Sequence, residues 1–295
     1  MTTQALNQML RRLIEPGPLT RVSRSIEIFG WVDLALGLLI LIAPRFTATL
    51  FHLPPPFPLD ISLLRVVGAL VITLGVLYII NGRFNSQGFA VGALLDRPLV
   101  PVIMAVLWHN HILPGSLAAS FSIVDFSGFL ATAFAWRADI LHGQSIGGPS
   151  LSGQTRAARS AEVFGWLILA IGIVTLLFPG FVASLLRIPS CCLSPGANYL
   201  QLAGLLTGGL GVLAIVGASF DTEGFVIAAV AVQLIAPLLV ALSWWGIPRG
   251  LALAFVGINL AGAVSTLLGI YADRRSGNKS ERAPFIAQWI SAFFA

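Results

Sequence analysis

Charged residues are scarce in this chain. Lys, Arg, Asp and Glu together make up 10% of its 295 residues, whereas a typical soluble domain carries about 25%. Hydrophobic residues make up 57%, and the mean hydropathy is +0.90. This composition excludes an ordinary soluble domain and predicts an integral membrane protein whose main surroundings are the lipid bilayer.

Cysteine and the common catalytic motifs are also nearly absent. The two cysteines are neighbours, Cys191 and Cys192, so they predict free thiols rather than a disulfide framework. The sequence contains no His-Glu-x-x-His, Gly-x-Ser-x-Gly, P-loop, dinucleotide-binding or haem-attachment motif. We therefore expect a protein that is not an enzyme, and no cofactor is indicated.

Long apolar runs are present instead. Eight runs of about 18 to 21 residues recur, each close to the roughly 20 residues that cross a bilayer as a helix. They predict an all-α polytopic membrane protein with eight transmembrane helices. The runs lie near 26–43, 61–81, 88–108, 116–136, 161–179, 199–218, 224–244 and 250–270.

The cations are distributed unevenly between the two sides that this topology creates. With the N-terminus inside, twelve of the 17 cations fall in inner segments, three in outer loops, and two, Arg65 and Arg97, within spans. This bias predicts a multi-pass protein of a bacterial-type inner (plasma) membrane with both termini in the cytoplasm. Topology also explains the net charge of +5, so the charge does not indicate a nucleic acid partner.

The two halves of the chain resemble each other. The stretch "RSIEIFGWVDLALGLLILIAPRF" from Arg24 matches "RSAEVFGWLILAIGIVTLLFPGF" from Arg159, and the match continues with small slips over about 115 residues. Because each copy holds four spans, both enter the membrane in the same direction, which predicts two parallel four-helix repeats. The predicted organisation is a cytoplasmic amphipathic segment 1–23, a first module 24–137, a linker 138–158, a second module 159–273, and a basic stretch with an amphipathic C-terminal helix 274–295.

Glycines seven residues apart recur in both modules and predict faces where helices approach closely. The pairs are Gly30/Gly37, Gly68/Gly75, Gly165/Gly172 and Gly204/Gly211. The stretch "LRVVGALVITLGVLY" resembles the second span of bacterial DoxX-like four-helix membrane proteins, and the whole chain resembles a tandem of that unit. The resemblance implies the four-helix fold and says little about activity.

Five charged residues lie within the spans of the first module, namely Asp33, Arg65, Asp96, Arg97 and Asp125. Each costs about 2.5 to 3.5 kcal/mol on insertion scales, so such residues are functional candidates. Asp33 and Asp96 lie about 12 Å from the cytoplasmic ends of their helices, in one layer with Arg97. Arg65 and Asp125 enter from the outer side, and their depths predict a pair.

The second module separates these residues into two groups. Three charged residues, Arg65, Arg97 and Asp125, align with neutral residues that still form hydrogen bonds, namely Gln201, Gln233 and Asn259. This pattern predicts a structural polar network of Arg65, Asp125, Gln201, Gln233 and Asn259. Asp33 and Asp96 instead align with Ile168 and Val232. We therefore expect Asp33, Asp96 and Arg97 to bind a ligand or ion; the alternative is that the two carboxylates only neutralise Arg97.

His109 and His111 are weak candidates for a metal site. Two residues apart on a helix, their side chains diverge by about 200°, and no third ligand is near in the sequence. Interfacial histidines at a helix end are the simpler interpretation, and we expect no metal.

Two functions fit these patterns. The first is a non-enzymatic accessory or scaffolding component of a membrane assembly that holds a small apolar ligand. The amphipathic termini, around Leu6–Ile14 and Phe285–Phe294, then lie on the inner leaflet or contact other membrane subunits. The alternative is a proton- or ion-linked small-molecule transporter that uses Asp33, Asp96 and Arg97. A water-accessible cavity in the first module favours the transporter; sealed polar residues favour the scaffold.

Overall fold

The computed structural model describes Arg11, residues 13–15 and residues 17–53, 58–143, 154–188, 193–220, 223–242 and 247–276. Within these ranges the chain is helical and contains no strand. The helices are α2 (Arg21–Ile42), α3 (Pro44–Leu50), α4 (Pro58–Arg83), α5 (Gln87–Asp96), α6 (Leu99–His109), α7 (Gly115–Leu141), α8 (Arg156–Leu177), α9 (Pro179–Leu185), α10 (Leu193–Ser219), α11 (Glu223–Leu242) and α12 (Arg249–Ser276).

The prediction of eight membrane spans is confirmed. Eight helices in the described part are long and apolar enough to cross a bilayer, with α5 and α6 together forming the third span. The predicted terminal amphipathic stripes, the two cysteines and the middle of the predicted linker fall mainly outside the described residues.

The same order of elements occurs twice. Helices α2 and α8 both begin after a threonine, Thr20 or Thr155, whose hydroxyl accepts a hydrogen bond from the backbone N–H three residues later. Each is followed by a seven-residue helix that starts at a proline, Pro44 or Pro179. The second, third and fourth spans then follow in each half.

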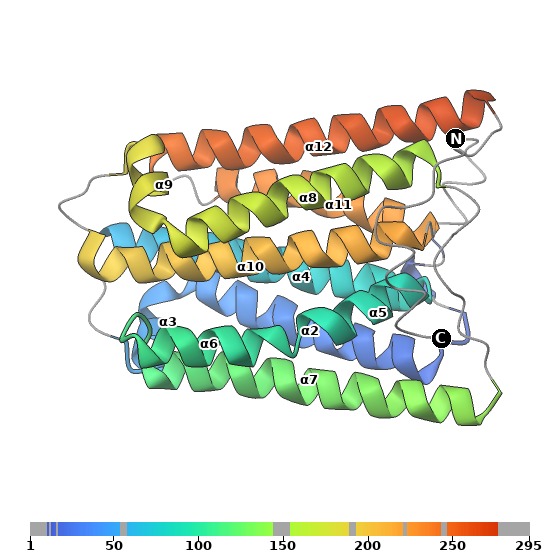
Figure 1. Cartoon of the computed structure of the whole chain (residues 1–295), viewed down its shortest axis with the longest axis horizontal. Coiled ribbons are helices and arrows are strands. Elements are labelled where there is room, and N and C mark those ends of the chain that lie inside the picture. Colours follow the sequence, from blue (N-terminus) through green and yellow to red (C-terminus); the bar gives the residue numbers. More distant parts are fainter. Residues whose placement is uncertain are drawn as a thin grey trace.

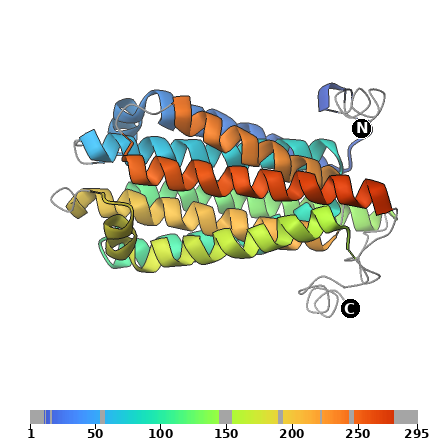
Figure 2. The same ribbon diagram turned by 90° about the horizontal axis from the view of Figure 1, so that it is seen from above.

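Helices α4 and α10 form the centre of the bundle. Helix α4 packs on α2 and also on α10 and α11 of the other half, while α10 packs on α8 and also on α4 and α5. Figures 1 and 2 show α7 and α12 at the periphery, on opposite sides of this centre. The two halves are therefore joined through their second and third spans, and the first and fourth spans face outward.

Glycines determine how closely the first and second spans of each half approach. A Cβ atom built on Gly37 of α2 lies 2.6 Å from the backbone nitrogen of Ile72 in α4, and one on Gly75 lies 2.6 Å from that of Leu34. In the second half a Cβ on Gly211 of α10 lies 2.6 Å from the backbone nitrogen of Leu169. Only residues without a side chain fit these contacts, as the spacing of the glycines predicted.

Candidate functional site

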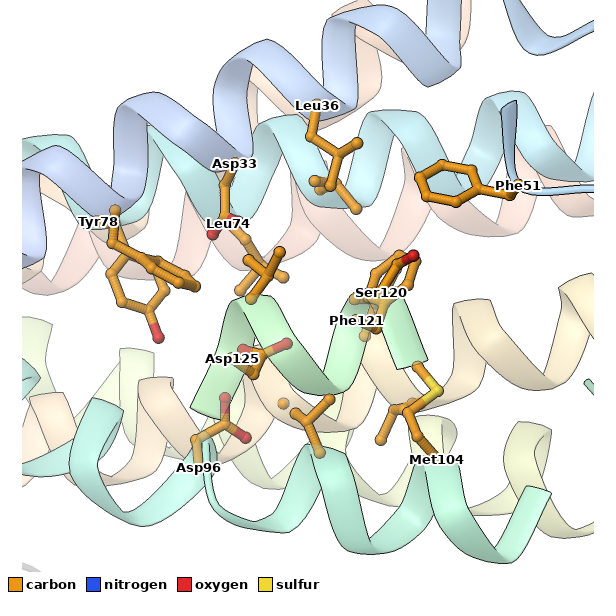
Figure 3. Close-up of a pocket in the computed structure, with 17 residues that line it drawn as sticks. Asp33, Leu36, Phe51, Leu74, Tyr78, Asp96, Met104, Ser120, Phe121 and Asp125 are labelled. Atoms are coloured by element: carbon orange, nitrogen blue, oxygen red, sulfur yellow. The ribbon is translucent and has the colours of Figure 1, made fainter. Parts of the chain in front are cut away.

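A cavity of about 130 Å³ lies inside the first half of the bundle. Its walls come from α2, α4, α5, α6 and α7 and from α10 of the other half, and most of the lining side chains are apolar. Three aspartates also line it: Asp33 from α2, Asp96 from α5 and Asp125 from α7. Figure 3 shows Asp33 on one side of this space, with Asp96 and Asp125 on the opposite side.

The three carboxylates lack a direct partner among the residues that the structure describes. Within the described part of the chain, no hydrogen bond or ion pair joins Asp33, Asp96 or Asp125 to another group. A carboxylate that leaves water without a compensating partner is very costly. The cavity is therefore suited to bind a group that compensates the negative charge of these carboxylates, which is a proton, a cation or the polar head of a ligand.

Arg97 lies beside this cavity and is fully buried. Its Nε donates to the Tyr78 hydroxyl at 3.3 Å, and its Nη1 donates to Thr132 Oγ1 at 2.8 Å. The guanidinium carbon lies 3.7 Å from the ring centroid of Phe29 and 4.7 Å from that of Tyr78, within the range of a cation–π interaction. Arg97 is thus held by neutral groups and makes no ion pair with a carboxylate in the described residues.

The formal charges of Arg97 and of the three aspartates do not balance. Three carboxylates and one guanidinium leave a formal excess of two negative charges when all are ionised. The alternative that Asp33 and Asp96 serve only to neutralise Arg97 leaves the third carboxylate, that of Asp125, without a stated role.

The third span is interrupted at these residues. Helix α5 ends at Asp96 and α6 begins at Leu99, with Arg97 and Pro98 between them. Proline has no N–H to donate, so one hydrogen bond of the helical ladder is missing here, although Arg97 and Pro98 both keep helical backbone angles. Asp96 is the tenth residue of α5 and lies about 13.5 Å along the helix from its first residue.

The packing around Arg97 recurs in the second half with a neutral residue. A Cβ built on Gly128 of α7 lies 2.6 Å from Phe29 Cδ2 and 2.9 Å from Arg97 Nη1. In the second half, a Cβ built on Gly262 of α12 lies 2.6 Å from Phe164 Cδ2 and 3.0 Å from Gln233 Nε2.

The second half contains a corresponding cavity with different chemistry. It measures about 410 Å³, and Ile168 and Asn259 line it at the positions of Asp33 and Asp125. The Asn259 amide donates to the carbonyl of Phe255 in its own helix at 2.8 Å, and no acidic residue lines the cavity. The two halves thus pack in a similar way, but the cavity in the first half is acidic and the cavity in the second half is apolar.

Each cavity is closed by the second span of the other half. Leu206 and Gly209 of α10 line the acidic cavity, and Leu70 and Thr73 of α4 line the apolar one. A Cβ built on Gly209 lies 3.2 Å from Asp96 Oδ1. Glycine at this position therefore leaves room for the carboxylate.

The structure brings together some of the predicted site residues and regroups others. Asp33 and Asp96 share a cavity, with Arg97 beside them, as expected. Asp125 joins them, although its depth had grouped it with Arg65, which does not line this cavity. Depth along a helix does not reveal the direction in which a side chain points, and that direction decided the grouping.

The predicted structural network is only partly an interhelical one. The Gln201 amide of α10 donates to the carbonyl of Leu176 in α8 at 3.0 Å and so joins two helices. Gln233 is buried beside Gly262, and its Oε1 has no hydrogen-bond partner in the described structure. Asn259 donates to the carbonyl of Phe255 within its own helix, at 2.8 Å.

The two histidines end the third span. His109 is the last residue of α6, and His111 follows it with a positive φ of 56°. In the described part of the chain, no group of three or more His, Cys, Asp or Glu side chains is arranged to hold a metal ion.

Tyr78, Thr132 and Phe29, the neutral groups that hold Arg97, were not among the predicted site residues. The sequence does contain one signal for Tyr78, because the register that aligns Gly75 with Gly211 aligns Tyr78 with Ala214. In the structure a Cβ on Gly30 meets Tyr78 Cβ at 2.8 Å, and a Cβ on Gly165 meets Ala214 Cβ at 2.9 Å. The aromatic residue is thus specific to the half that carries the charges.

Comparisons of this chain with family models, with curated proteins and with solved structures found no match. The candidate function therefore rests on the geometry of the cavity.

Proposed function

We propose that this integral membrane protein is a proton-linked transporter of a small organic cation, and that Asp33, Asp96 and Asp125 form its binding site. The observation that carries the proposal is the cavity in which these three carboxylates lie among apolar side chains, with no hydrogen bond or ion pair to any described residue. A cation with a short apolar body satisfies both parts of this lining, because its charge meets the carboxylates and its body meets the apolar walls.

Proton linkage follows from the same groups. A proton and a cation compensate the same carboxylates, so binding of one disfavours binding of the other. The fixed charge of Arg97 limits the excess negative charge, and its bonds to Tyr78 and Thr132 hold it in place.

The accessory or scaffolding function remains a second hypothesis. It relies on polar residues that are sealed and on amphipathic termini that contact other subunits. The first condition is met for Asp33, Asp96 and Arg97, which are only 8%, 9% and 0% exposed. The terminal stripes lie mainly outside the described residues, and the bilayer accounts for the exposed apolar faces of α7 and α12 equally well.

The proposal predicts that the purified protein binds n-butylammonium and that binding weakens as the pH falls, because protons compete for the same carboxylates. Binding is measured by isothermal titration calorimetry, and in liposomes by uptake of the labelled amine against a pH gradient. The uncharged analogue n-butanol serves as the control ligand. Equal binding of n-butanol, or binding of the amine that does not change with pH, contradicts the proposal.

We also propose that the chain is a tandem of two DoxX-like four-helix units in an inner (plasma) membrane, with both termini in the cytoplasm. The matched glycine contacts and the recurrence of the Arg97 packing at Gln233 support the duplication. Reporters inserted in 82–87, in 138–157 and after residue 275 are expected on the cytoplasmic side, and those in 55–59 and 190–197 on the outside. One clear reversal in an accessibility assay contradicts this topology.

A further inference from the structure

A groove of about 830 Å³ runs along the outer surface of the second half, between α8 and α12. Arg156 and Arg159 lie at its end near the start of α8. From there it passes the small residues Gly257 and Gly262 of α12. The groove therefore has a basic end and a long wall that extends into the membrane.

The side chains of the two arginines are available to a ligand. Both residues are exposed, and no hydrogen bond or ion pair to either side chain is found in the described part of the chain. The nearby Asp273 carboxylate accepts hydrogen bonds from the backbone N–H groups of Arg156 and Ala157, each at 3.0 Å. That carboxylate therefore caps α8.

Beyond the arginines the wall of the groove is mostly apolar, with Ser160 and Ser265 as its polar residues, and its length is close to the depth of one leaflet. Val163, Phe164 and Leu167 of α8 line it. Arg159 and Leu167 are eight residues apart, or about 12 Å along the helix, and one leaflet contributes about 15 Å of the hydrocarbon core. At its far end the groove shares Ile258 with the apolar cavity of about 410 Å³. A chain that follows the groove thus ends against an apolar space.

We propose that this groove binds one anionic phospholipid, with the phosphate at Arg156 and Arg159 and an acyl chain between α8 and α12 that extends toward the apolar cavity. The charge of the arginines matches the phosphate, and the wall matches the chain. Basic pockets between transmembrane helices are suited to anionic lipid head groups.

The first half provides an internal comparison. Its groove of about 570 Å³ also has two arginines, Arg21 and Arg24, but Arg21 Nη2 is 3.4 Å from His142 Nε2. Ile123, which is 68% exposed, occupies the position of Gly257. Beyond the groove lies the acidic cavity rather than an apolar one. We therefore expect the lipid to bind in the second half.

The test uses the full-length protein, delipidated in an uncharged detergent and titrated with phosphatidylglycerol, with phosphatidylcholine as the neutral head group. Native mass spectrometry measures the bound lipid. We expect one phosphatidylglycerol per chain, bound more tightly than phosphatidylcholine. Arg156→Gln with Arg159→Gln is expected to weaken its binding about 30-fold, since each arginine contributes roughly a factor of five. Arg21→Gln with Arg24→Gln is the matched control and is expected to change it less than about three-fold.

A second variant tests the groove without removing charge. Gly257 lines the groove, and a Cβ atom built on it meets nothing within 4 Å, so Gly257→Ile is expected to fold and to occupy space in the groove. It should lower phosphatidylglycerol binding at unchanged thermal stability. Equal binding of both lipids, equal loss in the two arginine double variants, or full binding by Gly257→Ile each overturns the proposal and indicates ordinary surrounding lipid.

Discussion

Asp33→Ile is expected to abolish the pH-dependent binding of n-butylammonium while the protein remains folded. Asp33 has no hydrogen bond or ion pair in the described part of the chain, so its replacement breaks no protein contact of that kind. Ile168 lines the second cavity at the corresponding position, which indicates that the helix packing accommodates an isoleucine there. The free energy of unfolding is expected to change by no more than about 1 kcal/mol. Calorimetry measures the loss of amine binding, and thermal unfolding in detergent measures whether the protein remains folded.

Asp33→Asn separates charge from volume in the same experiment. It keeps the size of the side chain and removes the negative charge, so binding of the amine is expected to fall as it does in Asp33→Ile. If Asp33→Asn binds normally, packing rather than charge governs the cavity. If Asp33→Ile unfolds, Asp33 belongs to the structural framework and the proposed site loses its first residue.

Gly172→Ala is expected to destabilise the protein by about 1–3 kcal/mol or more. A Cβ atom on Gly172 of α8 lies 2.6 Å from the backbone Cα of Gly208 in α10. Because the obstacle is backbone rather than a flexible side chain, the two helices must separate. Thermal unfolding of the purified protein measures the loss.

Gly208→Ala is the matched control across the same helix contact. A Cβ atom built there meets only Leu169 Cδ1, at 3.9 Å. Alanine also favours a helix over glycine by about 1 kcal/mol. Gly208→Ala is thus expected to be neutral or stabilising, and equal destabilisation by both variants contradicts the proposed close contact between α8 and α10.

The eight spans and the glycine faces follow from local properties of the sequence. A bilayer requires each spanning segment to satisfy its own backbone hydrogen bonds and to be apolar over about 20 residues, so hydropathy alone locates the helices. Glycine spacing of seven residues places Gly30 and Gly37 on one face of α2, and that face packs on α4. The comparison of the two halves also singled out Asp33 and Asp96, which share the acidic cavity.

Three features required the tertiary structure. Asp125 reaches the acidic cavity because of the rotation of α7 about its axis, and the sequence specifies depth more directly than rotation. Tyr78 and Thr132 hold Arg97 from two other helices, so this contact depends on how those helices are arranged in space. The reciprocal closure of each cavity by the other half's second span arises from packing between the halves, which no pattern within a single span encodes.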